Sequence, residues 1–152
     1  MGENLTICVV GLGYVGLPTA IAFHKAGFRV FGIDVNKEVI DSIESGKSHL
    51  SDGSSDLKIP LNSDRWSVSQ SFEKAVMESD IILITVPTPV KSDRTPDLSI
   101  VESAMRSVLE SMTEGRNQII VVESTVFPGA TMGIAESIEA EMFLTNSESL
   151  FE

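Results

Sequence analysis

Three glycines near the N-terminus have the spacing of a phosphate-binding turn. Gly11, Gly13 and Gly16 form a G-x-G-x-x-G pattern that follows an apolar run over residues 5–10 and precedes a helical pattern. In such a turn the first glycine lets the chain leave a strand sharply, the second lets bare backbone approach a pyrophosphate, and the third lets the helix pack against the strand. The phosphate then accepts from free N–H groups at the helix start. The cofactor contacts predicted here are Gly11, Gly13, Tyr14, Val15 and Gly16.

An acidic residue stands where a second apolar run ends. Asp34 follows residues 30–33 and lies about 20 positions after Gly16, the distance at which a carboxylate hydrogen-bonds the adenosine ribose of NAD. Asp34 can also cap the next helix, and the two roles are compatible. No arginine follows it closely, so the pattern favours NAD over NADP. The turn and Asp34 together predict a dinucleotide site with NAD as the cofactor. No metal is predicted, because the chain has a single cysteine and no cluster of metal ligands.

Two further polar segments, residues 87–89 and 124–125, each follow an apolar run. In an open parallel sheet, ligands bind outside the carboxyl ends of the strands. By themselves, such segments are typical of turns and helix caps. Beside a glycine turn they are instead predicted to form the far wall of a nicotinamide site, with Val86, Pro87, Thr88, Ser124 and Thr125 as contacts.

Elements that would position these residues alternate along the chain. Strands are predicted over residues 5–10, 30–33, 66–69, 80–86, 118–123 and 142–145, and helices over residues 14–26, 72–77, 99–112 and 130–141. A further helix is predicted after Asp34 from the apolar pattern of residues 39, 40 and 43, and Gly46 ends it. Ser99 and Glu102 have capping-box spacing. The apolar residues within the runs 80–86 and 118–123 are consecutive rather than alternating with polar ones, as in strands covered on both faces. This order predicts an α/β, Rossmann-type, doubly wound and mainly parallel sheet flanked by helices, with residues 1–152 as one domain.

Composition limits the classes of function. The chain has 152 residues, of which 42% are apolar, and a net charge of −11. That charge argues against nucleic acid and anionic membranes as partners. There is neither an apolar run long enough to span a membrane nor a basic N-terminal start, so a cytoplasmic protein is expected. The single cysteine, Cys8, falls inside the first strand and is expected to be an inert buried thiol.

Four motifs in order resemble one known family. Residues 11–18 (GLGYVGLP), 86–89 (VPTP), 96–99 (PDLS) and 123–131 (ESTVFPGAT) look like the N-terminal domain of the UDP-glucose/GDP-mannose dehydrogenase family. The last two look most like its UDP-N-acetyl-hexosamine 6-dehydrogenase branch. The resemblance covers nearly the whole chain and implies oxidation of a UDP-sugar C6 alcohol to a carboxylate. In that family the reaction takes two steps, reduces two NAD+ and passes through a cysteine-bound thiohemiacetal and thioester.

The resemblance also implies roles for single residues. The three glycines would hold the pyrophosphate, Asp34 the adenosine ribose and Thr88 the phosphate or ribose region of NAD. Thr125 is similar to a threonine that positions the catalytic water. Residues 146–152 (NSESLFE) are similar to the family's N-P-E-x-L-x-E loop, with serine in place of proline. Glu148 would therefore take part in proton transfer near the substrate, and Glu152 would lie near the cofactor.

In the family, the nucleophilic cysteine, a catalytic lysine and most of the sugar-nucleotide site come from a central helix and a second domain. Residues 1–152 contain neither, so an NAD-binding domain without activity of its own is expected, and UDP-sugar would bind only to a longer form.

The sequence is compatible with a homodimer, and two alternative functions remain. One alternative is an NAD-binding regulatory module without catalysis. Another is a complete small reductase, which would need a base such as a Tyr-x-x-x-Lys pair. Tyr14 is the single tyrosine and lies in the glycine turn.

Overall fold

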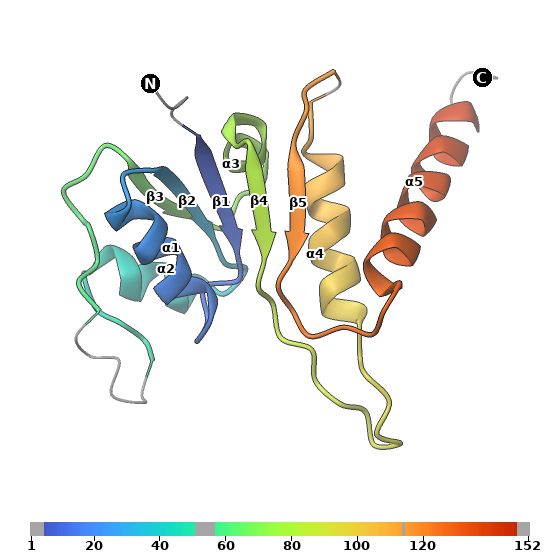
Figure 1. The fold of residues 1–152 in the computed structure, drawn as a ribbon, viewed down its shortest axis with the longest axis horizontal. Coiled ribbons are helices and arrows are strands. Elements are labelled where there is room, and N and C mark those ends of the chain that lie inside the picture. The colour runs from blue at the N-terminus through green and yellow to red at the C-terminus, as the bar shows by residue number, and fades with distance from the viewer. Residues whose placement is uncertain (1–4, 51–56, 114, 149–152) are drawn as a thin grey trace.

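The computed structural model describes residues 5–50, 57–113 and 115–148. Five parallel strands form one sheet in the order β3-β2-β1-β4-β5 (Figure 1). The strands are β1 (Thr6–Val10), β2 (Arg29–Ile33), β3 (Trp66–Ser69), β4 (Ile81–Ile84) and β5 (Ile119–Val122). All their carboxyl ends lie on one edge of the sheet, which is the lower edge in Figure 1.

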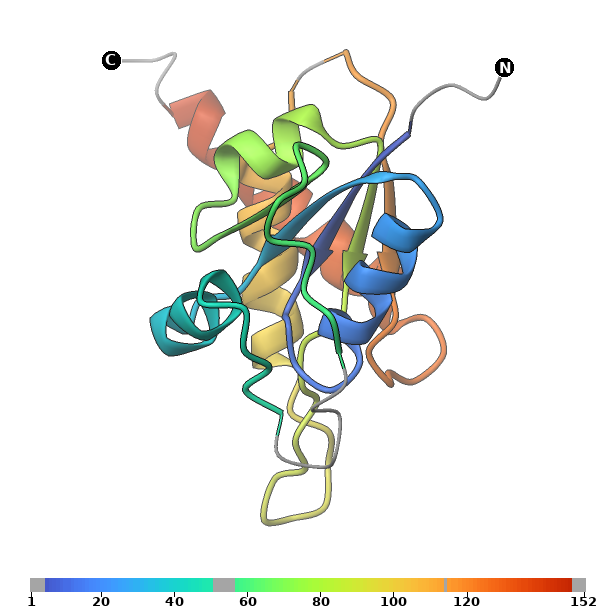
Figure 2. The ribbon, with the colours of Figure 1, turned by 90° about the vertical axis from the view of Figure 1, so that its left-hand side faces the viewer.

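Helices cover both faces of the sheet. They are α1 (Gly16–Lys25), α2 (Lys37–Glu44), α3 (Glu73–Glu78), α4 (Ser99–Glu110) and α5 (Ala130–Glu148). Figure 2 shows α4 and α5 on the side of the sheet opposite α1. Two buried clusters match this arrangement: Leu17 and Ile43 of α1 and α2 pack with one face of the strands, whereas Val76, Met105 and Ile138 of α3, α4 and α5 pack with the other. The predicted doubly wound α/β fold is confirmed.

The strands have the sequence character that a doubly covered sheet requires. In β1 every residue is buried, and in β4 all but the first are. Side chains alternate between the two faces of a strand, so both sets must be apolar when helices lie on each side. The edge strand β5 differs, because Ile119 is 59% exposed and the rest of the strand is only half-buried. The prediction that residues 118–123 form a strand covered on both faces was therefore only partly correct.

The structure corrects two other local predictions. Residues 142–145, predicted as a strand, belong to α5, and this helix also includes Asn146, Ser147 and Glu148. A four-residue apolar run does not distinguish a short strand from the end of a helix. Ser99 is not the N-cap of a capping box: α4 begins at Ser99, and the Ser99 N–H donates to the Asp97 carboxylate at 3.1 Å.

None of the helices in the described ranges has the length and apolar character needed to cross a bilayer.

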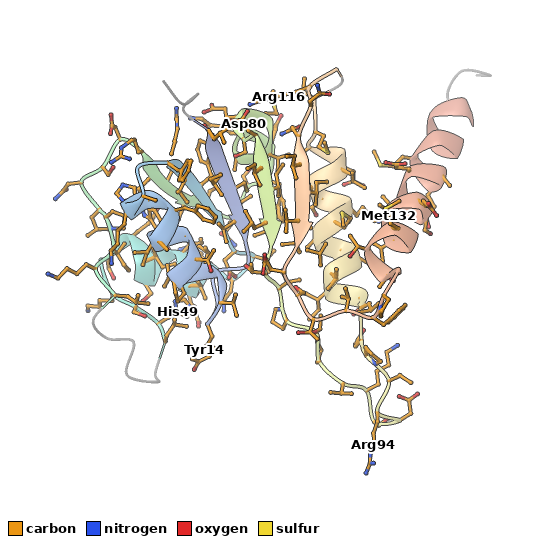
Figure 3. All side chains as sticks on the ribbon, viewed as in Figure 1. Tyr14, His49, Asp80, Arg94, Arg116 and Met132 are labelled. Carbon is orange, nitrogen blue, oxygen red and sulfur yellow. The ribbon has the colours of Figure 1, made fainter. Side chains whose placement is uncertain are left out.

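A polar network joins the amino ends of three strands. The Asp80 carboxylate accepts from the Thr6 N–H at 2.8 Å and from the Arg116 guanidinium at 2.9 Å. Arg116 also donates to the carbonyls of Met77 and Glu78. Figure 3 shows Asp80 and Arg116 at the edge of the sheet opposite Tyr14. The hydrogen bond from Thr6, and then Arg116, hold the pKa of Asp80 below its usual range. The network therefore stabilises the fold at a distance from the glycine turn.

An Asp80→Asn variant is expected to lose about 1–2 kcal/mol of unfolding free energy at pH 7, because it weakens two hydrogen bonds to a charged group. The carboxylate has a lower pKa folded than unfolded, so its contribution is present above the unfolded value, near 4, and is lost as pH falls through the folded value. Urea titrations from pH 7 to pH 3 should show the difference between the two proteins shrinking.

The matched control for this network is Asp41→Asn. Asp41 pairs with Lys37 on an exposed helix face, at 2.6 Å with both side chains more than half exposed. Such pairs contribute little, so this variant should stay within about 0.5 kcal/mol of the wild type. If the unfolding free energy lost in Asp80→Asn did not vary with pH, the electrostatic explanation would be contradicted.

Candidate functional site

The order of the strands places one crevice at the carboxyl edge of the sheet. From β1 the chain moves outward to β2 and β3, then returns to add β4 and β5 on the other side of β1. In such sheets ligands bind where the strand order reverses, outside the carboxyl ends of the strands. The glycine turn connects β1 to α1 at this point. The predicted turn therefore lies at the expected ligand site.

Two of the three glycines are required by the protein's own packing. Gly11 has φ +90°, and a Cβ there would lie 3.0 Å from the carbonyl oxygen of Thr85. A Cβ on Gly16 would lie only 1.8 Å from the carbonyl oxygen of Gly11. Gly11 thus permits the turn out of β1, and Gly16 permits the close approach of α1.

Gly13 differs from the other two glycines. A Cβ built on it would meet no protein atom within 4 Å. Packing within the chain therefore gives no reason for a glycine here. Bare backbone facing open space at the start of a helix fits the approach of a pyrophosphate.

The start of α1 suits an anion. Its N-cap residue, Val15, makes no side-chain capping bond, and the first turn contains no acidic residue. Tyr14 and Val15 are 60% and 58% exposed beside it. Unsatisfied N–H groups and the helix dipole both favour negative charge at this end.

Thr85 fixes the turn from the neighbouring strand. Its buried hydroxyl lies 2.9 Å from the carbonyl oxygen of Val10 and 2.7 Å from that of Gly11, while its N–H donates to Val10. Thr85 was not among the residues predicted from the sequence, because it lies inside an apolar run and only the pairing of β1 with β4 reveals its partner.

Asp34 lies at the end of β2, where it was predicted. One carboxylate oxygen accepts from the N–H of Leu12 at 2.8 Å and the other from the N–H of Asn36 at 2.9 Å. These bonds fix the carboxylate beside the glycine turn. Each oxygen has two acceptor positions, so both retain capacity for a ribose hydroxyl. Asn36, and not Asp34, caps α2, through a bond from the Glu38 N–H.

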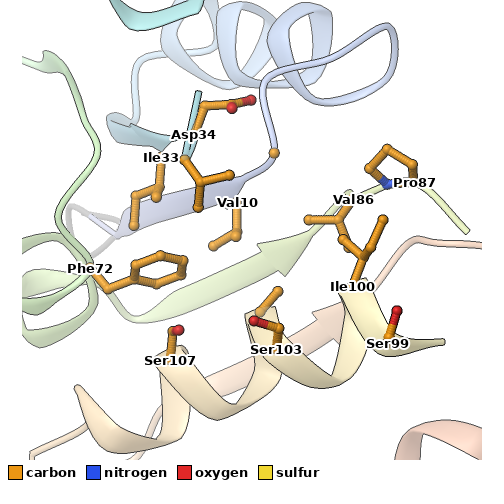
Figure 4. Close-up of a pocket in the computed structure, with 13 residues that line it drawn as sticks. Val10, Ile33, Asp34, Phe72, Val86, Pro87, Ser99, Ile100, Ser103 and Ser107 are labelled. Atoms are coloured by element: carbon orange, nitrogen blue, oxygen red, sulfur yellow. The ribbon is translucent and has the colours of Figure 1, made fainter. Parts of the chain in front are cut away.

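A cleft of about 290 Å³ opens beside Asp34 (Figure 4). Such a volume is near the lower end for ligand sites, so the cleft suits one part of a dinucleotide. Four residues predicted as cofactor contacts line it: Gly11, Asp34, Val86 and Pro87. The other lining residues were not predicted as cofactor contacts; they are Val10, Ile33, Val35, Phe72, Ser99, Ile100, Ser103, Ala104 and Ser107.

The remaining predicted residues lie outside the lining of this cleft. Ser124 follows β5 and its hydroxyl bonds the carbonyl of Val86 at 2.6 Å, which joins the ends of β4 and β5. Thr88 is half-buried and Thr125 is exposed. Glu148 is the last residue of α5, and Glu152 lies outside the described residues.

The single cysteine does not supply a nucleophile. Cys8 is buried in β1, and burial raises the pKa of its thiol to about 12. A reactive cysteine needs an exposed, electropositive setting that favours the thiolate. The expectation of an inert thiol agrees with this environment.

Comparisons with known proteins converge on one family. Residues 5–149 match the model of the UDP-glucose/GDP-mannose dehydrogenase family, NAD binding domain. The chain is 40% identical over 137 residues to a UDP-N-acetyl-D-mannosamine dehydrogenase of Pyrococcus horikoshii, covering 89% of this chain and 32% of that protein. Over 140 residues it is 40% identical to the Escherichia coli K12 protein of the same name, covering 90% and 31%.

Solved structures agree with these relatives. A GDP-mannose dehydrogenase from Pseudomonas aeruginosa, solved as a ternary complex, aligns with a TM-score of 0.81 and 32% identity over 87% of this chain and 31% of that one. The chain thus spans about a third of the length of the relatives that it matches.

Proposed function

The chain belongs to the UDP-glucose/GDP-mannose dehydrogenase family, whose NAD-binding domain it forms, and on this premise we propose that it is the cofactor domain of a nucleotide-sugar 6-dehydrogenase. The proposed substrate is a UDP-N-acetyl-hexosamine, whose C6 alcohol is oxidised to a carboxylate. Relatives named as UDP-N-acetyl-D-mannosamine dehydrogenases support this choice. The observation that carries the proposal is the open space at Gly13 beside an Asp34 carboxylate that retains acceptor capacity.

Different residues are proposed to bind different parts of NAD. The start of α1, with the backbone at Gly13, Tyr14, Val15 and Gly16, holds the pyrophosphate. Asp34 accepts from the adenosine ribose. When bound, NAD supplies the hydride acceptor.

On the other side of β1, Thr88 and Ser124 lie after β4 and β5 and are proposed to border the nicotinamide half. Thr125 is proposed to position the catalytic water, Glu148 to take part in proton transfer and Glu152 to lie near the cofactor. These last roles rest on the family motifs.

NAD is expected to bind at least about tenfold more tightly than NADP. The Asp34 carboxylate would lie against the 2′-phosphate of NADP, and like charges in contact cost several kcal/mol. The nearest cation in sequence, Lys37, is engaged by Asp41 at 2.6 Å. Calorimetric titration of the chain with NAD and with NADP measures the ratio of the two affinities. In an Asp34→Asn variant this ratio should be smaller. Tighter binding of NADP by the wild type would refute the role of Asp34.

The dehydrogenase role can be tested by exchanging domains. The first third of the Escherichia coli relative would be replaced by residues 1–149 of this chain, and NADH formation would be followed with UDP-N-acetylmannosamine. We expect turnover, because the two domains are 40% identical over 140 residues. The same chimera with Thr125→Ala serves as the matched variant and is expected to turn over more slowly. A chimera that folds and binds NAD but gives no NADH would contradict the proposal.

A further inference from the structure

Helix α4 presents two unused hydroxyls to the cleft beside Asp34. Ser103 and Ser107 are one turn apart and both line it. Figure 4 shows both on α4, across the cleft from Val10 and Ile33. Among the described residues, neither hydroxyl has a hydrogen-bond partner. By contrast, the Thr19 hydroxyl of α1 donates to the carbonyl of Val15 at 2.7 Å, the bond to the fourth preceding carbonyl that hydroxyls on helices commonly form.

The cleft lies on the adenosine side of the site. Gly11 and Asp34 line it, and these are the proposed positions of the pyrophosphate and the adenosine ribose. Val86 and Pro87, which were predicted for the nicotinamide wall, border the same cleft at the end of β4. From there it continues along α4 towards Phe72 (Figure 4). A base attached to a ribose at Asp34 therefore enters the space between α4 and the ends of β1 and β2.

The walls of this space suit a flat, polar-edged ring. Val10, Ile33 and Ile100 supply apolar surface, and Phe72 lies opposite Ser107. Adenine has two apolar faces and an edge that carries ring-nitrogen acceptors and the N6 amine donor. A serine hydroxyl can donate to one and accept from the other. The cleft thus combines apolar contact for the faces with two free hydroxyls for the edge.

We propose that Ser103 and Ser107 recognise the polar edge of the adenine ring of NAD. The assignment rests on the NAD-binding role of the chain and adds two specificity-determining residues to it. Their hydroxyls are positioned by α4 before the ligand arrives, so that binding need not order a loop to form these bonds. Removing one neutral hydrogen bond of this kind is expected to weaken binding about three- to tenfold.

The test is calorimetric titration of Ser103→Ala, Ser107→Ala and the double variant with NAD and with AMP. Alanine is a better helix former than serine, so α4 is expected to remain folded, and a thermal melt verifies this. Ser111→Ala, which ends the same helix outside the cleft lining, is the matched control. Each cleft variant should lose about three- to tenfold in affinity, and the double variant about tenfold or more. The control should not change.

AMP separates this inference from NAD binding itself. AMP carries the adenine and its ribose but no nicotinamide, so the fold-loss measured with AMP should equal that measured with NAD. Unchanged affinity in both cleft variants, or a loss with NAD that AMP does not share, would overturn the assignment while leaving NAD binding intact. A wild-type chain that bound neither ligand would instead overturn the proposed function.

Discussion

Gly16→Ala is expected to destabilise the chain by about 3 kcal/mol or more and to abolish NAD binding. A single methyl group at this position would lie 1.8 Å from the carbonyl oxygen of Gly11 and 2.5 Å from the Thr85 hydroxyl. The nearest clash is with backbone, so no change of rotamer relieves it. Helix α1 would have to move away from β1, which would break the hydrogen bond from Thr85 to Gly11. Overpacking that forces backbone shifts costs about 1–3 kcal/mol and sometimes more.

The matched variant is Gly13→Ala. Its methyl group would meet no protein atom within 4 Å, so its unfolding free energy should stay within about 1 kcal/mol of the wild type. NAD affinity should nevertheless fall at least about tenfold, because the methyl group occupies the space left for the pyrophosphate. Urea denaturation and NAD titration of both variants separate the two effects. A Gly13→Ala protein that bound NAD normally would show that the pyrophosphate does not lie there.

The parts of the fold that could be predicted are those with a local cause. Continuous apolar runs mark β1 and β4, and glycines mark the turn between β1 and α1. Residues 142–145 were mispredicted because their apolar character fits a strand and a helix end equally well. The exposure of Ile119 could not be foreseen, since it depends on β5 lying at the edge of the sheet.

The candidate site shows the same division. Asp34 and the glycines could be proposed as cofactor contacts from the sequence, because their predicted roles depend on a spacing along the chain. The sequence did not predict the cleft residues Ser103, Ser107 and Phe72. They come from α4 and the segment before α3, and only tertiary packing decides which face of a helix lines the cleft. The serines do recur at intervals of four residues from Ser99 to Ser107, which indicates a hydroxyl stripe on α4. Without the position of Asp34, that stripe has no ligand assigned to it.

A polypeptide of these 152 residues is expected to bind NAD yet form no measurable NADH with UDP-N-acetylglucosamine, UDP-N-acetylmannosamine or UDP-glucose. The cleft and the glycine turn are proposed to orient the cofactor, but hydride transfer also needs a sugar held in attack geometry. Such positioning can contribute about 7–11 kcal/mol, so its loss would lower the rate by about five to eight orders of magnitude. The second oxidation needs a thiolate to form the covalent intermediate, and the single cysteine, Cys8, is buried with a pKa raised to about 12.

The assay follows NADH absorbance at high protein concentration, with the Escherichia coli relative as the positive control. Turnover by the purified chain that disappeared in a Thr125→Ala variant would contradict the expectation, because it would require that this domain alone build a substrate site.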